Sequence, residues 1–341
     1  SRILLTLHEI GKYNFRNKKC FKSQIQITSI SCDKITIMPI PLKQAITVGF
    51  YLFKQKLKGN KKYPLVLMLE PLFRCNLECL GCGKIQKPHE ILRKNLSPKE
   101  CFRAAEDCEA PIVSIAGGEP LMHPDIIEIV QGLVKRGRYV YLCTNALLLD
   151  SFFDQLPKSP LLTLSVHLDG NEAEHDRIVD RPGTYKKAVE AIRKAKSLGF
   201  RVTCNTTIFD NVSIKDAEGF FDSLKPLSLD GITVSSGFQY EDAPDQKHFM
   251  GRKKTFEYFD QLLSLNKKGR WDFNHSPLYL DFLRGKRNYN CTPWGNPNYS
   301  VLGWQKPCYL LDEGYAETFQ ELLETTPWEK YGHINNPKCA D

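Results

Sequence analysis

Three cysteines at positions 75, 79 and 82 are spaced to hold an iron–sulfur cluster. In the pattern C-x3-C-x2-C, each thiolate can bind one iron of a 4Fe–4S cluster, and the missing fourth ligand leaves one iron open for an exchangeable group. The next cysteines, Cys101 and Cys108, fall in an expected amphipathic helix, where cysteine is usually a small apolar residue. A zinc site or a simple electron-transfer centre, each of which normally takes a fourth ligand, is the weaker alternative.

The triad follows the first of six apolar segments that alternate with helical patterns, which is typical of βα units around a parallel sheet. We expect an α/β fold, a partial (β/α)6 TIM-like barrel with catalytic groups at the carboxyl ends of its strands. The expected strands are Leu65–Glu70, Ile112–Ala116, Tyr139–Thr144, Leu162–His167, Arg201–Thr207 and Gly231–Ser235. The expected helices are Pro98–Cys108, capped by Ser97, and Asp125–Arg136, Ser151–Leu156, Tyr185–Leu198, Ser213–Leu224 and Thr255–Leu265.

The rest of the chain divides by composition. Residues 1–37 show no sustained periodicity and are interpreted as a non-family extension, either a cloning artefact or a native arm, with a plausible start at Met38. Residues 38–64 contain a basic amphipathic helix, and residues 65–240 form the barrel core. Residues 241–341 are rich in Cys, Trp and Pro, and they predict a smaller irregular domain that closes the barrel and looks truncated.

The helix expected over Pro41–Lys58 has one apolar face, and lysines fall around it. Two interpretations stay open: this face packs on the barrel, or it lies in a membrane interface. The apolar positions are Leu42, Ile46, Gly49, Phe50, Phe53 and Leu57, and the lysines are Lys43, Lys54, Lys56, Lys58, Lys61 and Lys62.

The composition indicates the cellular compartment in which the protein works. No apolar run is long enough to cross a bilayer, and no signal peptide is recognisable, so we expect a cytoplasmic protein. Twelve cysteines then favour reduced thiols and metal ligands over disulfides. The net charge of +8 does not by itself select a partner.

Gly117, Gly118, Glu119 and Pro120 end the second expected strand. With the triad, this run resembles the radical S-adenosylmethionine (SAM) superfamily, whose members bind SAM at the open iron and cleave it to a 5′-deoxyadenosyl radical. The resemblance implies that the glycine-rich run holds the SAM amino group, with Glu119 accepting from the ammonium.

Further SAM contacts follow from the same resemblance. Asp169, at the end of the fourth strand, would bind the ribose, and Arg177 would pair with the SAM carboxylate unless it is an ordinary surface charge. Asn205 is a further pocket candidate, together with Ser235 and Ser236. Many superfamily members have an aromatic residue just before the third cysteine, whereas this chain has Gly81, so adenine packing must come from elsewhere.

The segments 139–149, 273–278, 291–295 and 303–311 are similar to the adenosylhopane synthases of hopanoid biosynthesis. This narrower resemblance implies addition of the 5′-deoxyadenosyl radical to diploptene, a membrane hydrocarbon, forming a C–C bond. Cys143, at the carboxyl end of the third strand, would then quench the adduct radical by donating its thiol hydrogen atom. The resemblance also implies a reducing partner such as flavodoxin or ferredoxin, and peripheral contact with the inner face of the membrane.

Several interpretations remain open. Cys291, Cys308 and Cys339 could bind an auxiliary cluster, although structural roles are favoured because the ligand set is incomplete. Phe273, His275, Trp294 and Trp304 could line a hydrocarbon pocket or pack in a core. The alternatives in function are a radical SAM enzyme acting on another lipid or a peptide, and an iron–sulfur or zinc module that binds nucleic acid. The last lacks a clustered basic motif with interleaved aromatic residues, so we expect no nucleic acid partner.

Overall fold

The computed structural model describes residues 40–239 and 242–339. Its centre is a nine-stranded sheet in the order β6-β5-β4-β3-β2-β1-β7-β8-β9. The first six strands are parallel and wind in chain order, so their carboxyl ends meet at one edge. They are β1 (Val66–Glu70), β2 (Ile112–Ile115), β3 (Tyr139–Thr144), β4 (Leu162–His167), β5 (Arg201–Ile208) and β6 (Ile232–Ser236).

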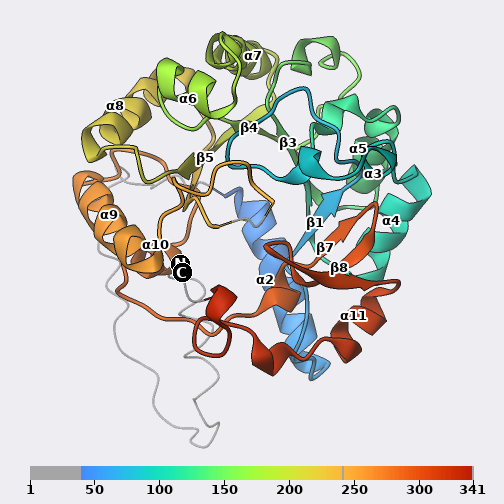
Figure 1. Cartoon of the computed structure of the whole chain (residues 1–341). Helices are drawn as coiled ribbons and strands as arrows, with labels where there is room; N and C mark the ends of the chain where they lie inside the picture. The colour runs from blue at the N-terminus through green and yellow to red at the C-terminus, as the bar shows by residue number, and fades with distance from the viewer. Residues whose placement is uncertain (1–39, 240–241, 340–341) are drawn as a thin grey trace, which may run out of the picture.

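Helices cover the outer face of these strands (Figure 1). Ser97 begins α4 with a complete capping box: its hydroxyl accepts from the backbone N–H of Glu100, whose carboxylate accepts from the N–H of Ser97. The helices of this layer are α3 (His89–Leu92), α4 (Pro98–Asp107), α5 (Ile126–Lys135), α6 (Glu172–Ile178), α7 (Thr184–Ser197) and α8 (Ile214–Leu224). The expected partial barrel is therefore confirmed.

All six expected strands are present, each within one residue of its expected ends, whereas the helix expected over Ser151–Leu156 is wrong. A 3₁₀ turn at Leu149–Ser151 and irregular turns occupy that connection. Six residues before Pro157 are too few to offset the cost of helix nucleation. Leu149, Phe153 and Leu156 are nevertheless buried, so the apolar residues that suggested a helix do pack in the core.

The C-terminal residues extend the same sheet. Strand β7 (Asn298–Ser300) pairs in parallel with β1, and β8 (Gly303–Cys308) and β9 (Leu311–Ala316) follow in antiparallel order. Helices α9 (Arg252–Leu265), α10 (Pro277–Leu283) and α11 (Phe319–Thr325) complete this part. The strands bring the C-terminal region directly beside the loop that follows β1 (Figure 1).

Helix α2 (Leu42–Leu57) contacts the barrel through polar side chains. Gln44 is buried and hydrogen-bonded to the Tyr141 hydroxyl of β3, and Thr47 lies 3.4 Å from the Tyr139 hydroxyl. Its apolar face is exposed instead: Leu42 by 58%, Ile46 by 49%, Phe50 by 71%, Phe53 by 60% and Leu57 by 73%. The apolar face therefore does not pack on the barrel. None of the helices in the described residues is long and apolar enough to span a membrane.

Candidate functional site

A cavity of about 370 Å³ opens at the carboxyl ends of the parallel strands. It brings together most of the side chains that the sequence singled out. Among the residues that line it are Cys75, Cys79, Cys82, Gly117, Gly118, Glu119, Cys143, Asp169, Asn205, Ser235 and Ser236. Pro120 is buried next to Glu119 without lining the cavity, and Arg177 lines a smaller neighbouring cavity.

The three thiols of the triad share one loop and are each partly buried. Backbone N–H groups donate to two of the sulfurs, from Leu77 to Cys75 and from Lys84 to Cys82. Burial, with smaller contributions from Glu119 and the Cys82 thiol, raises the pKa of Cys75 to about 11, and burial is also the main cause that raises the pKa values of Cys79 and Cys82. Thiols of this kind are protonated until a metal binds, when they release their protons.

The triad fits a cluster better than a single ion. Among the described residues, no three His, Cys, Asp or Glu side chains are arranged to hold one metal ion. In a 4Fe–4S cluster each cysteine binds a different iron, so the thiolates need not converge on one point. The triad has three thiols on one loop, N–H donors at two of the sulfurs and an adjoining cavity, and this arrangement suits a cluster in which each thiolate binds its own iron.

The two glycines of the Gly117–Pro120 run let two backbone segments touch. A Cβ at Gly118 would lie 1.8 Å from the Arg74 carbonyl oxygen, and one at Gly117 would lie 2.3 Å from that of Leu72. Gly117 also has a φ of +104°, which side chains disfavour. The N–H groups of Gly118 and Glu119 donate to the Leu72 and Arg74 carbonyls at 3.1 and 2.8 Å. The glycines thus hold the loop that carries Cys75 against the end of β2.

Glu119 is almost fully buried, at 1% exposure, and accepts three hydrogen bonds. They come from the N–H of Leu121 at 3.1 Å, the Thr144 hydroxyl at 2.8 Å and the N–H of Asn145 at 2.9 Å. Burial raises the pKa of Glu119 in spite of these donors. A carboxylate held in this way beside the triad can receive an ammonium group, which would offset the burial.

An aromatic ring covers the position before the third cysteine, although the residue there is Gly81. The Phe209 ring, from just after β5, lies 2.9 Å from where a Cβ of Gly81 would be. Phe209 and Phe249 stand 6.0 Å apart, and both line the cavity. The aromatic surface that the sequence expected to come from elsewhere is therefore available from the barrel itself.

Cys143 lines the cavity from β3, with its sulfur 3.4 Å from the Ser114 hydroxyl oxygen. Burial raises its pKa, although hydrogen bonds with Ser114 and Ser165 oppose the shift. The thiol therefore keeps its hydrogen at neutral pH, which a hydrogen-atom donor requires.

Asp169 is buried, and its carboxylate already has protein partners. It accepts from the Thr207 N–H at 2.6 Å and contacts His167 Nε2 at 2.6 Å. Burial opposes the charged form of His167, but Asp169 outweighs it, so the pKa of His167 is raised. Asn205 lies opposite His167 on β5. Arg177 forms two hydrogen bonds with Glu174, at 3.1 and 2.7 Å, outside this cavity.

The four aromatic candidates for a hydrocarbon pocket do not line the cavity. Trp304 and Phe273 are buried in the core, Trp294 stacks edge-on against Trp328, and the His275 ring is hydrogen-bonded to the backbone of Val234. Core packing, the alternative interpretation, accounts for them. The rings that do line the cavity belong to Phe209, Phe238, Phe249 and Tyr309.

The sequence did not single out Glu70, Lys84, His167 or Tyr309, although all line the cavity. A period of two along β4 could have identified His167, because it shares a strand face with Asp169 and Ser165. Tyr309 follows a strand that no periodicity predicted, and no local signal marks it.

Comparison with known proteins identifies the core. Residues 69–224 match the model of the radical SAM superfamily, and residues 232–341 match a domain of unknown function, DUF3463. The chain is 26% identical over 277 residues to a GTP 3′,8-cyclase of Clostridium botulinum, covering 73% of this chain and 84% of that protein. It is 32% identical over 225 residues to a GTP 3′,8-cyclase of Aquifex aeolicus, covering 62% and 66%.

Solved structures agree in fold. SuiB of Streptococcus suis bound to S-adenosylmethionine superposes with a TM-score of 0.61 at 17% identity, covering 75% of this chain and 62% of SuiB. The structure of anSMEcpe with bound AdoMet and a peptide superposes with a TM-score of 0.60 at 18% identity, covering 79% and 82%.

These findings correct the narrower function inferred from sequence. The curated relatives reported above are GTP 3′,8-cyclases rather than adenosylhopane synthases, so neither hopanoid synthesis nor diploptene as a partner is supported. Of the segments that suggested the resemblance, 139–149 and 303–311 contain strands β3 and β8, whereas 273–278 and 291–295 lie outside the strands. A shared fold does not determine the substrate. The match over residues 69–224 supports the superfamily, whose members use a 4Fe–4S cluster and SAM and need a reductant.

Proposed function

Because this chain is a member of the radical SAM superfamily over residues 69–224, we propose that its cavity is the active site of a SAM-cleaving enzyme that ends its reaction at Cys143. The bound cluster and SAM supply an electron and a 5′-deoxyadenosyl radical. The observation that carries the proposal is that the triad, Glu119 and the Cys143 thiol line one cavity.

Each side chain has a defined task in this proposal. Cys75, Cys79 and Cys82 hold the cluster, and Glu119 accepts from the SAM ammonium. Phe209 covers the side of the cavity above Gly81, where it can pack on the adenine and exclude water. Asp169 and Asn205 lie where they can bind ribose hydroxyls, while Arg177, paired with Glu174, is assigned no SAM contact.

Cys143 suits the last step because its hydrogen is both present and weakly held. The thiol donates a hydrogen atom to a carbon radical, so an S–H bond breaks, a C–H bond forms, and the unpaired electron moves to sulfur. The enzyme's reductant and a solvent proton then restore the thiol. Ser114 and Ser165 fix the sulfur's orientation toward the cavity.

The charged side chains that line the cavity indicate how much negative charge its substrate can carry. The GTP 3′,8-cyclase relatives raise the possibility of a nucleoside triphosphate. However, Lys84 is the one Lys or Arg among the described residues that line this cavity, and it is paired with Glu70. Glu119 adds further negative charge, and Asp169 is paired with His167. Because a triphosphate needs several cations to offset its charge, we propose a substrate that carries little negative charge.

Abortive SAM cleavage in D₂O tests the role of Cys143 without a known substrate. Thiol hydrogens exchange with solvent, so 5′-deoxyadenosine formed by the reduced, reconstituted enzyme should carry deuterium taken from Cys143. Mass spectrometry should find less deuterium with Cys143→Ala and an unchanged amount with Cys204→Ala, a buried cysteine that does not line the cavity. Equal deuterium in all three proteins would refute the role, and no 5′-deoxyadenosine from the intact chain would refute SAM cleavage itself.

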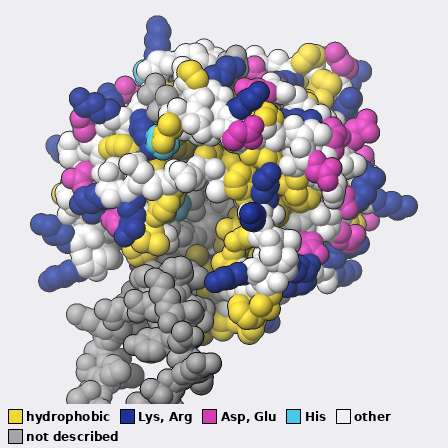
Figure 2. Space-filling view, turned by 90° about the horizontal axis from the view of Figure 1, so that it is seen from below, with side chains coloured by type: hydrophobic (Ala, Val, Ile, Leu, Met, Phe, Trp, Pro, Cys, Tyr) yellow, Lys and Arg dark blue, Asp and Glu magenta, His cyan; other side chains and the backbone are white. Residues whose placement is uncertain are grey.

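We also propose that α2 attaches the enzyme to an anionic membrane surface. Five large apolar side chains are exposed along one face of the helix, and Lys43, Lys54, Lys56, Lys58, Lys61 and Lys62 are exposed nearby. Seen from below in Figure 2, hydrophobic side chains gather across the middle of the molecule, with Lys and Arg around them. Apolar insertion together with lysine attraction is the physics of an interfacial helix.

Co-sedimentation with vesicles of phosphatidylcholine and phosphatidylglycerol tests this attachment. The intact chain should sediment with the vesicles, less so as salt rises, and Phe50→Ser/Phe53→Ser should stay largely in the supernatant. Phe102→Ser, whose ring is packed against α5, is the matched aromatic control and should still sediment if it folds. Equal partitioning of the α2 variant and the intact chain would refute the proposal.

A further inference from the structure

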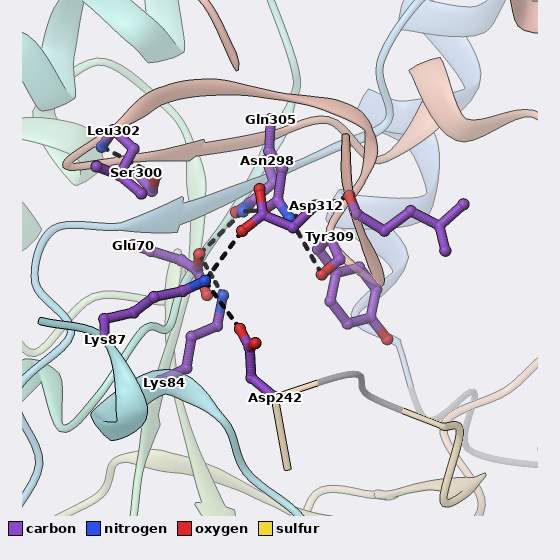
Figure 3. Close-up of polar contacts among 11 residues, drawn as sticks. Glu70, Lys84, Lys87, Asp242, Asn298, Ser300, Leu302, Gln305, Tyr309 and Asp312 are labelled. Carbon is purple, nitrogen blue, oxygen red and sulfur yellow. Dashed lines mark hydrogen bonds and ion pairs between the residues drawn. The ribbon is translucent and has the colours of Figure 1, made fainter. Parts of the chain in front are cut away.

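Lys84 connects the cluster loop to a buried carboxylate. It follows Cys82 by two residues, and its backbone N–H donates to the Cys82 sulfur. Its ammonium Nζ lies 2.9 Å from Oε2 of Glu70, at the end of β1 (Figure 3). The Lys84 side chain is 12% exposed and that of Glu70 is 4% exposed, so water screens this ion pair little.

The C-terminal strands hold Glu70 in place. The side-chain amide of Asn298, on β7, donates to the same Oε2 at 2.9 Å and to Oε1 of Gln305, on β8, at 2.6 Å (Figure 3). Gln305 in turn donates to the Leu311 carbonyl at 3.3 Å. Asn298 is fully buried and Gln305 nearly so. A segment some 230 residues away in sequence therefore fixes the carboxylate that holds Lys84.

A second lysine of the same loop makes a parallel connection. Lys87 lies 2.8 Å from an Asp242 oxygen and 2.9 Å from an Asp312 oxygen on β9 (Figure 3). It does not contact Glu70, and its partners are 38% and 36% exposed. Both lysines therefore anchor the loop through ion pairs. Lys84 is close to a cluster ligand, Cys82, whereas Lys87 is not.

We propose that Lys84 is a positioning residue of the cluster site, and that Asn298 and Gln305 hold its charge beside Cys82 so that the cluster is easier to reduce. Reduction adds negative charge to the cluster, and a fixed ammonium in a poorly screened site favours that state. Glu70 opposes the effect, but its carboxylate accepts hydrogen bonds from Lys84 and from Asn298, which offset its charge. The inference rests on the proposed function, because it needs a cluster at the triad. The inference assigns the C-terminal region a role in radical formation, because its residues hold the lysine that favours cluster reduction.

A redox titration of the reconstituted cluster, followed by electron paramagnetic resonance, tests the charge. Lys84→Met should lower the ratio of reduced to oxidised cluster about tenfold at a fixed solution potential, which is about 59 mV for a one-electron couple. Lys84→Arg should restore most of the ratio. Lys87→Met, the matched control from the same loop, should change it little. An unchanged potential in Lys84→Met, or an equal shift in Lys87→Met, would overturn the inference.

Asn298→Leu tests the link to the C-terminal strands, because it keeps every charge and nearly the same volume. We expect faster amide hydrogen exchange over residues 82–86, measured on the protein without its cluster, and a smaller shift of the potential in the same direction as Lys84→Met. Exchange as slow as in the intact chain would show that these strands do not hold the loop, and would overturn that part of the proposal. If the intact chain binds no cluster, the proposed function fails instead.

Discussion

Two groups of three cysteines lie in this chain, and they are assembled differently. Cys75, Cys79 and Cys82 share one loop and line the main cavity. Cys291, Cys308 and Cys339 come from three separate segments, near enough that each thiol influences another's charge. Cys291 is exposed at a surface cavity beside Trp294 and Trp328.

The two groups differ in how much of the chain must fold before their sulfurs come together. The first three sulfurs stay close even in an unfolded chain, because only a short loop must close around the cluster. The second three meet only when β8 and the final turn have docked. The single loop and the cavity that it lines therefore distinguish the first group from the second.

Removing a triad thiol should have the largest effect. We expect Cys79→Ala to lose its 4Fe–4S cluster and to cleave SAM only at background level, because two thiolates cannot hold the cluster. Iron content and 5′-deoxyadenosine formation after anaerobic reconstitution measure this. A variant that keeps full iron and activity would remove the distinction between the two groups.

Glu119→Gln should weaken SAM binding about tenfold to a hundredfold, because a hydrogen bond between charged groups contributes about 1.5–3 kcal/mol. Equilibrium binding of SAM to the cluster-loaded protein measures the loss. Glu90→Gln, an exposed carboxylate, is the control and should bind as the intact chain does. An equal affinity in both variants would show that the buried carboxylate does not distinguish the triad site.

Acid should destabilise the region around Asp169 through His175. This fully buried histidine accepts from the Asp169 N–H at 3.2 Å, and burial lowers its pKa to about 4. The unfolded chain takes up that proton first, near pH 6.5. Stability should therefore be unaffected above about pH 6.5 and fall by about 1 kcal/mol for each pH unit down to about pH 4.

Denaturant unfolding of the cluster-free protein at several pH values checks this. His175→Asn should lose part of the dependence, whereas His89→Asn, at an exposed position, should keep it. A slope that is the same in both variants would assign the acid sensitivity to other groups.

Changes in the second cysteine group should have the smallest effect. We expect Cys308→Ala to retain the same iron per chain and SAM cleavage within about twofold, with a stability loss of about 1 kcal/mol. Iron analysis beside the Cys79→Ala protein measures this. A clear fall in iron would instead reveal a second cluster and make the two groups alike.

The sequence predicted what depends on neighbours along the chain. The triad spacing, the six strands and the polar residues that end them follow from local patterns, and the strand ends then place Cys143 and Glu119 together. Strand β7 escaped prediction because it has only three residues. Strands β8 and β9 escaped because they contain Gly303, Pro307 and Gly314, which interrupt any alternation.

Contacts between distant segments could not be predicted in this way. A lysine such as Lys84 is usually a solvated charge, and only the fold gives it Glu70 and Asn298 as neighbours. Helical periodicity likewise predicted the apolar face of α2 but not whether that face is covered. Polar side chains such as Gln44 turned out to make the contact with the barrel.

The ring of Phe209 over Gly81 ties together two positions that could otherwise change independently in evolution. A side chain at position 81 would collide with that ring, and a smaller residue at 209 would leave the cavity wall open. Placing the aromatic group on the cysteine loop instead therefore takes two substitutions, and either one alone gives a less well packed protein. The two positions should covary, with one aromatic ring between them.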